Sequence, residues 1–201
     1  TYGTAFYGLN KLYLMMEKQH NRGQDGAGIA TVKLNVQAGT PFMKRIRCNN
    51  GQNIADIFKQ VQNEIEEVEK LQPDIRMYPE LMKGYLSYMG EVMLGHLRYG
   101  TQGRNNIEYC HPFIKSDINP LLNLCLAGNF NLVNTKELFH FVHKDELSKM
   151  KTDSDLSAMM EIIHYFLREE VNNNPDDIQW KEVLSKACSM FDGGFVAEGI
   201  C

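Results

Sequence analysis

The chain has 201 residues, which is enough to bury a hydrophobic core without disulfide or metal staples. Hydrophobic residues make up 43% and charged residues 23%, as in globular domains and unlike disordered or fibrous chains. With 21 basic and 25 acidic residues the net charge is −4, so no basic excess is present to hold a nucleic acid. We therefore expect one compact domain, without a linker and without a nucleic-acid partner.

No run approaches the ~18 consecutive apolar residues of a membrane span, and no charged segment followed by an apolar stretch opens the chain. We therefore expect no membrane partner and no secretory signal. The five cysteines are an odd number without a C-x-x-C pair, which favours reduced thiols and a cytoplasmic location. The chain starts at a threonine and stops within an apolar run, so we expect it to be a piece of a longer protein.

The first elements in chain order are a helix and a hairpin. Apolar residues from Leu9 to Met16 follow the i, i+3, i+4, i+7 spacing and predict a helix that ends before Asn21. Residues 28–34 and 42–47 are strand-like and flank an Ala-Gly-Thr-Pro turn. Their spacing predicts a β-hairpin.

A second amphipathic helix is predicted over residues 54–68, and its acidic run, 64–69, is interpreted as the solvated face. Residues 71–90 show no clear pattern. Residues 91–96 and 123–127 are short apolar runs bounded by glycine or polar residues, which is typical of buried strands.

The last third is predicted to be mostly helical. Helices are expected to begin at Thr135 and at Asp153, and a further helix at the Asn-Pro pair 174–175, where Asn is a capping residue and Pro suits the first turn. A strand is expected over 195–201. Because strands and helices occur in blocks and do not alternate strictly, the pattern favours an α+β fold over a doubly wound parallel sheet.

Three predicted loops combine glycine with hydrogen-bonding residues, at 21–28, 95–103 and 127–134. Glycine allows peptide N–H groups to approach a ligand closely, and polar residues at strand ends can converge on one pocket. None of the loops matches a G-x-x-x-x-G-K-[ST] or G-x-G-x-x-G phosphate cradle. Each loop alone is weak evidence for a site.

Taken together and in this order, the loops resemble the motifs of class II glutamine amidotransferase domains, which are N-terminal-nucleophile hydrolases. N-R-G-Q-D-G-A-G-I at 21–29 is similar to H-R-G-Q-D-[SA]-A-G-I, 95–103 to G-H-x-R-Y-[SP]-T-x-G, and 127–134 to A-H-N-G-N-L-V-N. Residues 111–113 and 151–155 are similar to Q-P-F and [TS]-S-D-[ST]-E. Among class II members, R-G-Q-D, R-Y-x-T and N-L-V-N most resemble the amidophosphoribosyltransferase family, with a resemblance extending from Tyr7 to Gly199.

The resemblance implies a four-layer αββα sandwich of the N-terminal-nucleophile hydrolase type, with residues 1–201 as a glutaminase domain that lacks its N-terminal cysteine strand. It implies hydrolysis of glutamine to glutamate and ammonia, for phosphoribosylamine formation in purine biosynthesis. The glutaminase domain needs no cofactor. A phosphoribosyltransferase domain that binds phosphoribosyl pyrophosphate with Mg²⁺ is expected downstream, in an enzyme expected to be a homo-oligomer.

By the same resemblance, Arg98 and Asp153 bind the α-carboxylate and the α-ammonium of glutamine, and Thr101 belongs to the substrate loop. Taken alone, Arg98 is more simply interpreted as half of a surface ion pair and Asp153 as a helix N-cap, and the capping role can hold at the same time. The oxyanion formed during attack on the amide requires preorganised donors, which the resemblance assigns to the Asn129 side chain and the Phe130 backbone N–H.

Further residues are assigned supporting roles by their motifs: Arg22, Gly23, Gln24, Asp25 and His96. His96, two residues before the substrate-binding arginine, is interpreted as orienting its loop and not as a catalyst. His140 and His143 lie three residues apart on an expected helix, and His164 lies on another. No carboxylate or cysteine spacing completes a metal set with them, so no metal site is expected.

The sequence departs from the family at three positions. Phe130 replaces a glycine, and a positive φ there would strain phenylalanine. Gly128 replaces a histidine. The family's nucleophile is an N-terminal cysteine whose α-amine is the general base, and we expect this cysteine upstream of Thr1. The alternatives are the glutaminase domain of another class II amidotransferase, an inactive regulatory or scaffolding module, or Thr1 as the nucleophile.

Overall fold

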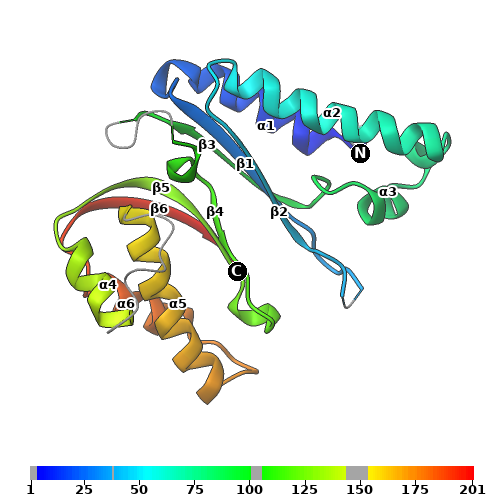
Figure 1. Ribbon diagram of the computed structural model, residues 1–201. Coiled ribbons are helices and arrows are strands. Elements are labelled where there is room, and N and C mark those ends of the chain that lie inside the picture. The colour runs from blue at the N-terminus through cyan, green and yellow to red at the C-terminus, as the bar shows by residue number, and fades with distance from the viewer. Residues whose placement is uncertain (1–3, 38, 101–105, 144–153) are drawn as a thin grey trace. The chain divides into compact units, whose positions relative to one another are not determined.

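The computed structural model describes residues 4–37, 39–100, 106–143 and 154–201. The chain divides into two compact units, Thr1–Pro112 and Phe113–Cys201 (Figure 1). Each unit contains an antiparallel three-stranded sheet with helices, so the predicted α+β class is confirmed. In the described segments, no helix has both the length and the apolar character needed to cross a bilayer.

The first unit contains the predicted helix–hairpin–helix sequence. Its main elements are α1 (Tyr7–Gln19), β1 (Gly26–Val32), β2 (Met43–Cys48), α2 (Asn53–Leu71) and β3 (Val92–Arg98). The strand order is β2-β1-β3, with β1 antiparallel to both neighbours. The expected β-hairpin is therefore confirmed.

Successive side chains of β1 point to opposite faces of this sheet, and the buried ones show which face the helices cover. Ala27 and Ile29 are almost fully buried and belong to one core with α1 and α2, which lie along the same face of the sheet (Figure 1). The helices contribute these buried residues to that core: Leu9, Leu12 and Met16 from α1, and Ile57, Val61 and Ile65 from α2. The intervening β1 positions, Gly26 and Gly28, consequently point to the opposite face.

The segment 71–90, which has no clear sequence pattern, contains two short helices. They are the 3₁₀-helix η2 (Ile75–Met77) and α3 (Pro79–Tyr85). Met82 is the buried residue of α3, and a seven-residue helix with one buried side chain has no repeating apolar face to detect. Short 3₁₀-helices also precede β1 and follow β3: η1 (His20–Arg22) and η3 (Ile107–Tyr109).

The second unit packs helices against a sheet of order β4-β5-β6. Its elements are β4 (Phe113–Lys115), η4 (Pro120–Leu122), β5 (Leu124–Leu132), α4 (Thr135–His143), α5 (Asp155–Asn173), α6 (Trp180–Cys188) and β6 (Gly193–Ile200). Leu124, Leu126 and Leu132 of β5 lie in one core with α5. The predicted helices at 135 and after 153 are confirmed, as is the final strand.

The prediction of a helix start at Asn174-Pro175 is wrong, because this pair closes α5. The Asn174 N–H donates to the Glu170 carbonyl at 2.7 Å. The Glu170 carboxylate accepts from the Asn174 side chain at 3.1 Å and from the Gln179 N–H at 3.2 Å. These bonds hold 174–179 as a turn, so α6 begins only at Trp180.

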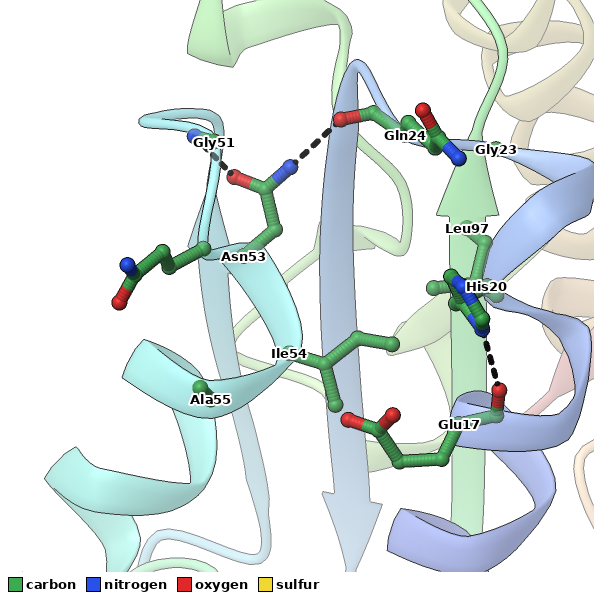
Figure 2. A pocket seen from close by; sticks show the side chains of 10 residues that line it. Glu17, His20, Gly23, Gln24, Gly51, Asn53, Ile54, Ala55 and Leu97 are labelled. Atoms are coloured by element: carbon green, nitrogen blue, oxygen red, sulfur yellow. Dashed lines mark hydrogen bonds between the residues drawn. The ribbon is translucent and has the colours of Figure 1, made fainter.

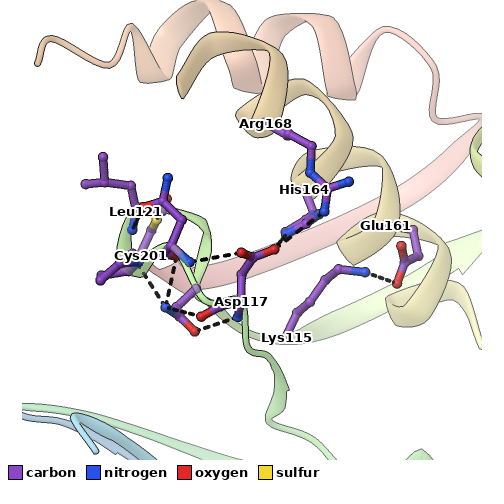
Figure 3. Close-up of polar contacts among 10 residues, drawn as sticks. Lys115, Asp117, Leu121, Glu161, His164, Arg168 and Cys201 are labelled. Atoms are coloured by element: carbon purple, nitrogen blue, oxygen red, sulfur yellow. Dashed lines mark hydrogen bonds and ion pairs between the residues drawn. The ribbon is translucent and has the colours of Figure 1, made fainter. Parts of the chain in front are cut away.

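A cluster of charged groups surrounds His164 on α5 (Figure 3). The Asp117 carboxylate lies 3.7 Å from the imidazole and 3.5 Å from the Arg168 guanidinium, and Lys115 pairs with Glu161 at 2.5 Å. His164 is 3% exposed. Burial, together with the charges of Lys115 and Arg168, lowers the pKa of His164 to about 4.

Stability is expected to decrease as the pH falls from 6.5 towards 4, because the unfolded chain binds the His164 proton at an ordinary pKa and the folded protein does not. Above that window the imidazole is neutral in both states. At about pH 4.5 the difference amounts to about 2–3 kcal/mol of unfolding free energy. Urea unfolding at about pH 7.5 and about pH 4.5 should show a smaller acid loss for His164→Gln than for the native sequence; equal losses would contradict this.

Candidate active site

Arg98 ends β3 on the sheet face that α1 and α2 leave uncovered. Its neighbour Leu97 pairs with Ala27 and packs in the helix-side core, so alternation directs Arg98 to the other face, opposite Gly26. Arg98 is only 6% exposed. An isolated surface ion pair, one of the two interpretations that the sequence allows, does not fit this burial.

The R-G-Q-D motif holds the backbone at Arg98 and directly after it. The Asp25 N–H donates to the Arg98 carbonyl at 3.1 Å, and the Asp25 carboxylate accepts from the Gly100 N–H at 2.7 Å. A Cβ at Gly23 would lie 2.7 Å from the carbonyl carbon of Arg98, so the loop packs directly on the end of β3. Thr101 lies outside the described residues.

A residue that the motif does not include, Asn53, fixes the Gln24 end of this loop. Its amide donates to the Gln24 carbonyl at 2.9 Å and accepts from the Gly51 N–H at 3.2 Å, and Asn53 is 7% exposed (Figure 2). In the sequence, Asn53 stands directly before an apolar helix. This position predicts the start of a helix and does not indicate that Asn53 anchors a loop. Gln24 itself is exposed.

A hollow of about 290 Å³ adjoins the same loop. It is lined by Glu17, His20, Gly23, Gln24, Gly51, Gln52, Asn53, Ile54, Ala55 and Leu97 (Figure 2). Because Leu97 lines it, the hollow opens on the helix-covered side of the sheet, whereas Arg98 points to the other side. The hollow is therefore separate from the arginine.

The segment after η3 covers Arg98 on the open face. The guanidinium carbon of Arg98 lies 5.8 Å from the centroid of the Tyr109 ring, and the guanidinium hydrogen-bonds the Cys110 side chain. Cys110 is fully buried, and this burial raises the pKa of its thiol. A neutral thiol orients the guanidinium without neutralising its charge.

Arg47 of β2 binds the segment after η3 and so holds it over Arg98. Its guanidinium donates to the Cys110 carbonyl at 3.0 Å and pairs with the Glu108 carboxylate at 3.2 Å. Neither Arg47 nor Cys110 belongs to a matched motif, and no sequence pattern singled them out. Their contact joins residues 63 positions apart in the chain, so no local sequence pattern predicts it.

The predicted supporting residues His96 and Arg22 differ in their surroundings. The His96 ring lies 4.3 Å from the His111 ring, centroid to centroid, on the same sheet face as Arg98. A Cβ at Gly28, which is opposite His96, would lie 2.0 Å from the His111 carbonyl oxygen. Arg22 is exposed on η1. Whether His96 orients the loop stays a prediction.

In the second unit, the expected loop at 127–134 is largely strand, because β5 extends to Leu132 and pairs with β6. Asn129 and Phe130 are opposite Val196 and Phe195. Among the described residues, Asn35 is the non-glycine residue with positive φ, so the predicted strain at Phe130 is wrong. Phenylalanine is acceptable here because the backbone is extended.

Gly128 and Phe130 occupy the same face of β5 and share its space. A Cβ at Gly128 would lie 2.6 Å from the tip of the Phe130 ring and 2.1 Å from the Val196 carbonyl oxygen. The Phe130 ring packs against the core of the second unit. The family's large residue at 128 and glycine at 130 are thus exchanged in this chain for a glycine and a large residue.

Asp153 lies outside the described residues. The residue that caps α5 is Ser154, whose hydroxyl accepts from the Ser157 N–H at 3.2 Å. Of the five cysteines, Cys48, Cys110 and Cys125 are buried, whereas Cys188 and Cys201 are exposed at the surface. Desolvation raises the pKa of the Cys201 thiol to about 11. Burial of the first three thiols and the raised pKa of Cys201 do not suit a nucleophile.

Curated relatives were found for most of the chain, whereas no protein-family model matches it. The amidophosphoribosyltransferase of Schizosaccharomyces pombe is 27% identical over 187 residues, 92% of this chain and 29% of the relative. That of Haemophilus influenzae is 30% identical over 152 residues, 76% of this chain and 24% of the relative. The chain spans about a quarter of the length of the curated relatives it matches.

Solved structures show the same fold. The allosteric regulatory enzyme of purine biosynthesis superposes with a TM-score of 0.63 at 21% identity, over 99% of this chain and 34% of that one. Glutamine phosphoribosylpyrophosphate amidotransferase from B. subtilis, in complex with ADP and GMP, has a TM-score of 0.58 at 23% identity, over 94% and 31%. In both its fold and its motifs, the chain is similar to class II glutamine amidotransferase domains. Within that class, it resembles the amidophosphoribosyltransferases.

Gly128→Ala is expected to destabilise the protein by about 2–3 kcal/mol, because the added Cβ meets backbone of β6 that cannot move without breaking the ladder. Gly194→Ala is the matched control, since it lies in the same pair of strands and a Cβ there meets nothing within 4 Å. Thermal unfolding of both variants provides the comparison. Equal shifts in Tm would contradict the assignment.

Proposed function

We propose that the chain is the glutaminase domain of an amidophosphoribosyltransferase-type enzyme, which hydrolyses glutamine and supplies ammonia for amination of phosphoribosyl pyrophosphate. The observation that carries the proposal is the buried Arg98, whose backbone is held by the R-G-Q-D motif and whose guanidinium is oriented by a neutral thiol. A fixed, charged guanidinium is suited to a carboxylate ligand.

In this proposal Arg98 binds the α-carboxylate of glutamine and Asp153 binds the α-ammonium. Charge-assisted bonds at both ends would place the side-chain amide at one position, which is the main requirement for attack on it. Thr101, three residues after Arg98, belongs to the same substrate loop. Asp25 and Gly23 position that loop through the backbone contacts described above.

The oxyanion would be stabilised by the Asn129 amide and the Phe130 peptide N–H. The extended backbone at Phe130 removes the strain argument for an inactive module, and the exchange of bulk between 128 and 130 accounts for both departures by packing. A peptide N–H is present whichever side chain position 130 carries, so the substitution preserves the donor.

The nucleophile in this proposal is a cysteine upstream of Thr1, with its own α-amine as general base. The thiolate attacks the amide carbon, ammonia leaves as the thioester forms, and water then releases glutamate. The buried or high-pKa state of Cys48, Cys110, Cys125 and Cys201 supports a nucleophile outside these positions.

The finer features of the resemblance belong to the same proposal. They are the four-layer αββα arrangement, a downstream phosphoribosyltransferase domain, a homo-oligomeric enzyme and a cytoplasmic location. Mg²⁺ is assigned to phosphoribosyl pyrophosphate on that further domain, and no step of glutamine hydrolysis is assigned to it.

Arg98→Lys and Asp153→Asn are each expected to lower kcat/KM for glutamine in the complete enzyme by about 10- to 100-fold, because one charge-assisted contact worth about 1.5–3 kcal/mol is lost. Activity with added ammonia should persist, since ammonia bypasses the glutamine site. Arg76→Lys, an exposed arginine paired with Glu69, is the control. A parallel loss of ammonia-dependent activity would assign these residues to the fold instead.

The nucleophile is tested by comparing two forms of the protein. The 201-residue chain should release no ammonia from glutamine, whereas the form processed to a free N-terminal cysteine should hydrolyse glutamine and be inactivated by diazo-oxo-norleucine. Peptide mass spectrometry locates the alkylated residue. Hydrolysis by the 201-residue chain, or a label on Cys110, Cys125 or Thr1, would overturn the assignment.

A further inference from the structure

The ladder between β5 and β6 sets the direction of each peptide N–H at the end of β5. The Val133 N–H donates to the Asp192 carbonyl at 2.9 Å, in register with Leu132 opposite Gly193. Hydrogen-bonded and non-hydrogen-bonded pairs alternate in an antiparallel ladder. The N–H groups of Leu132 and Phe130 therefore point away from β6, to the same edge of β5.

Asp155 contacts this edge of the strand. Its carboxylate accepts from the Leu132 N–H at 3.0 Å, a charge-assisted bond to a residue two positions after Phe130. Within the described residues, β4 pairs with β5 from Leu124 to Leu126, so strand pairing does not account for the order of this edge at Leu132.

The carboxylate is itself held in a fixed place. Asp155 is the first residue of α5, whose N-cap is Ser154, and the helix is anchored by Leu156 and Met159, each 1% exposed. Leu132 and Leu156 belong to the same core. The bond therefore connects two elements that already pack together, and it fixes the edge of one to the start of the other.

We propose that Asp155 is a positioning residue that aligns the Phe130 peptide N–H for oxyanion binding; this inference rests on the proposed glutaminase function. Asp155 does not touch the reacting atoms. It holds Leu132, and through two residues of extended backbone it sets the direction of the donor. A donor of this kind stabilises charge only when it is oriented before the charge develops.

An ordinary role for Asp155 is to offset the dipole of α5, because acidic residues are favourable in the first turn of any helix. Glu182 provides the matched control, since it is exposed in the first turn of α6. Removing Glu182 takes away the same kind of dipole interaction. Only Asp155 holds a strand edge in addition.

The experiment compares Asp155→Ala, Asp155→Asn and Glu182→Ala in the complete protein. Hydrogen exchange resolved to single residues by mass spectrometry reports the tether without any substrate. Asp155→Ala should speed exchange at Leu132 by about 10-fold and at Phe130 by about 3-fold, leaving Asn131, which bonds β6, unchanged. Asp155→Asn, which keeps an acceptor oxygen, should stay within about 2-fold of the native protein.

Steady-state kinetics then report the consequence for catalysis. Asp155→Ala should lower kcat with glutamine by about 10-fold, with KM within about 2-fold and ammonia-dependent activity unchanged, because the donor acts mainly in the transition state. Glu182→Ala should leave kcat unchanged. This split distinguishes positioning from a loss of fold.

Two results would overturn the inference. One is exchange at Leu132 in Asp155→Ala that matches Glu182→Ala, and the other is faster exchange with no fall in kcat. A native enzyme that does not hydrolyse glutamine would refute the proposed function instead, and the exchange data would still decide whether Asp155 holds the strand.

Discussion

Close approach of the chain to the open face of β1 is the constraint on which the arginine site depends. Gly26 and Gly28 carry no side chain, and neighbouring atoms occupy the space that a side chain would need. A Cβ at Gly26 would lie 2.6 Å from the Cys110 sulfur, and a Cβ at Gly28 would lie 2.0 Å from the His111 carbonyl oxygen. The segment after η3 can therefore cover Arg98. A side chain at position 26 or 28 would push this segment away from the sheet and expose the Arg98 guanidinium.

The segment after η3 also sets the electrostatic surroundings of Arg98. Two of the groups that contact the Arg98 guanidinium are uncharged: the Tyr109 ring and the Cys110 thiol, whose raised pKa keeps it neutral. The nearby Glu108 is engaged by Arg47. Burying a guanidinium is costly unless polar groups contact it, so these contacts matter for the stability of the fold around Arg98.

In the second unit, packing is maintained by an exchange of side-chain volume between two positions of β5. Moving bulk from position 128 to position 130 keeps β5 extended and places the Phe130 ring in the core. The peptide groups of the strand are unaffected by which of the two positions carries the large side chain. The substitutions at positions 128 and 130 depart from the motif, but they leave the peptide N–H groups of β5 in place.

The sequence by itself determined the elements with long apolar periods, such as α1, α2 and α5, and the motifs around Arg98 and Asn129, because both signals are local. It did not reveal the seven-residue α3, which is too short to show a period, nor that Asn174 closes a helix, since Glu170 and Gln179 decide that by their hydrogen bonds. Cys110, Arg47 and Asn53 lie outside the matched motifs, and the motif that contains Asp155 did not reveal its bond to the Leu132 N–H. Only the tertiary structure could show these contacts, because each joins partners distant in sequence, at a distance that strand register and helix packing set.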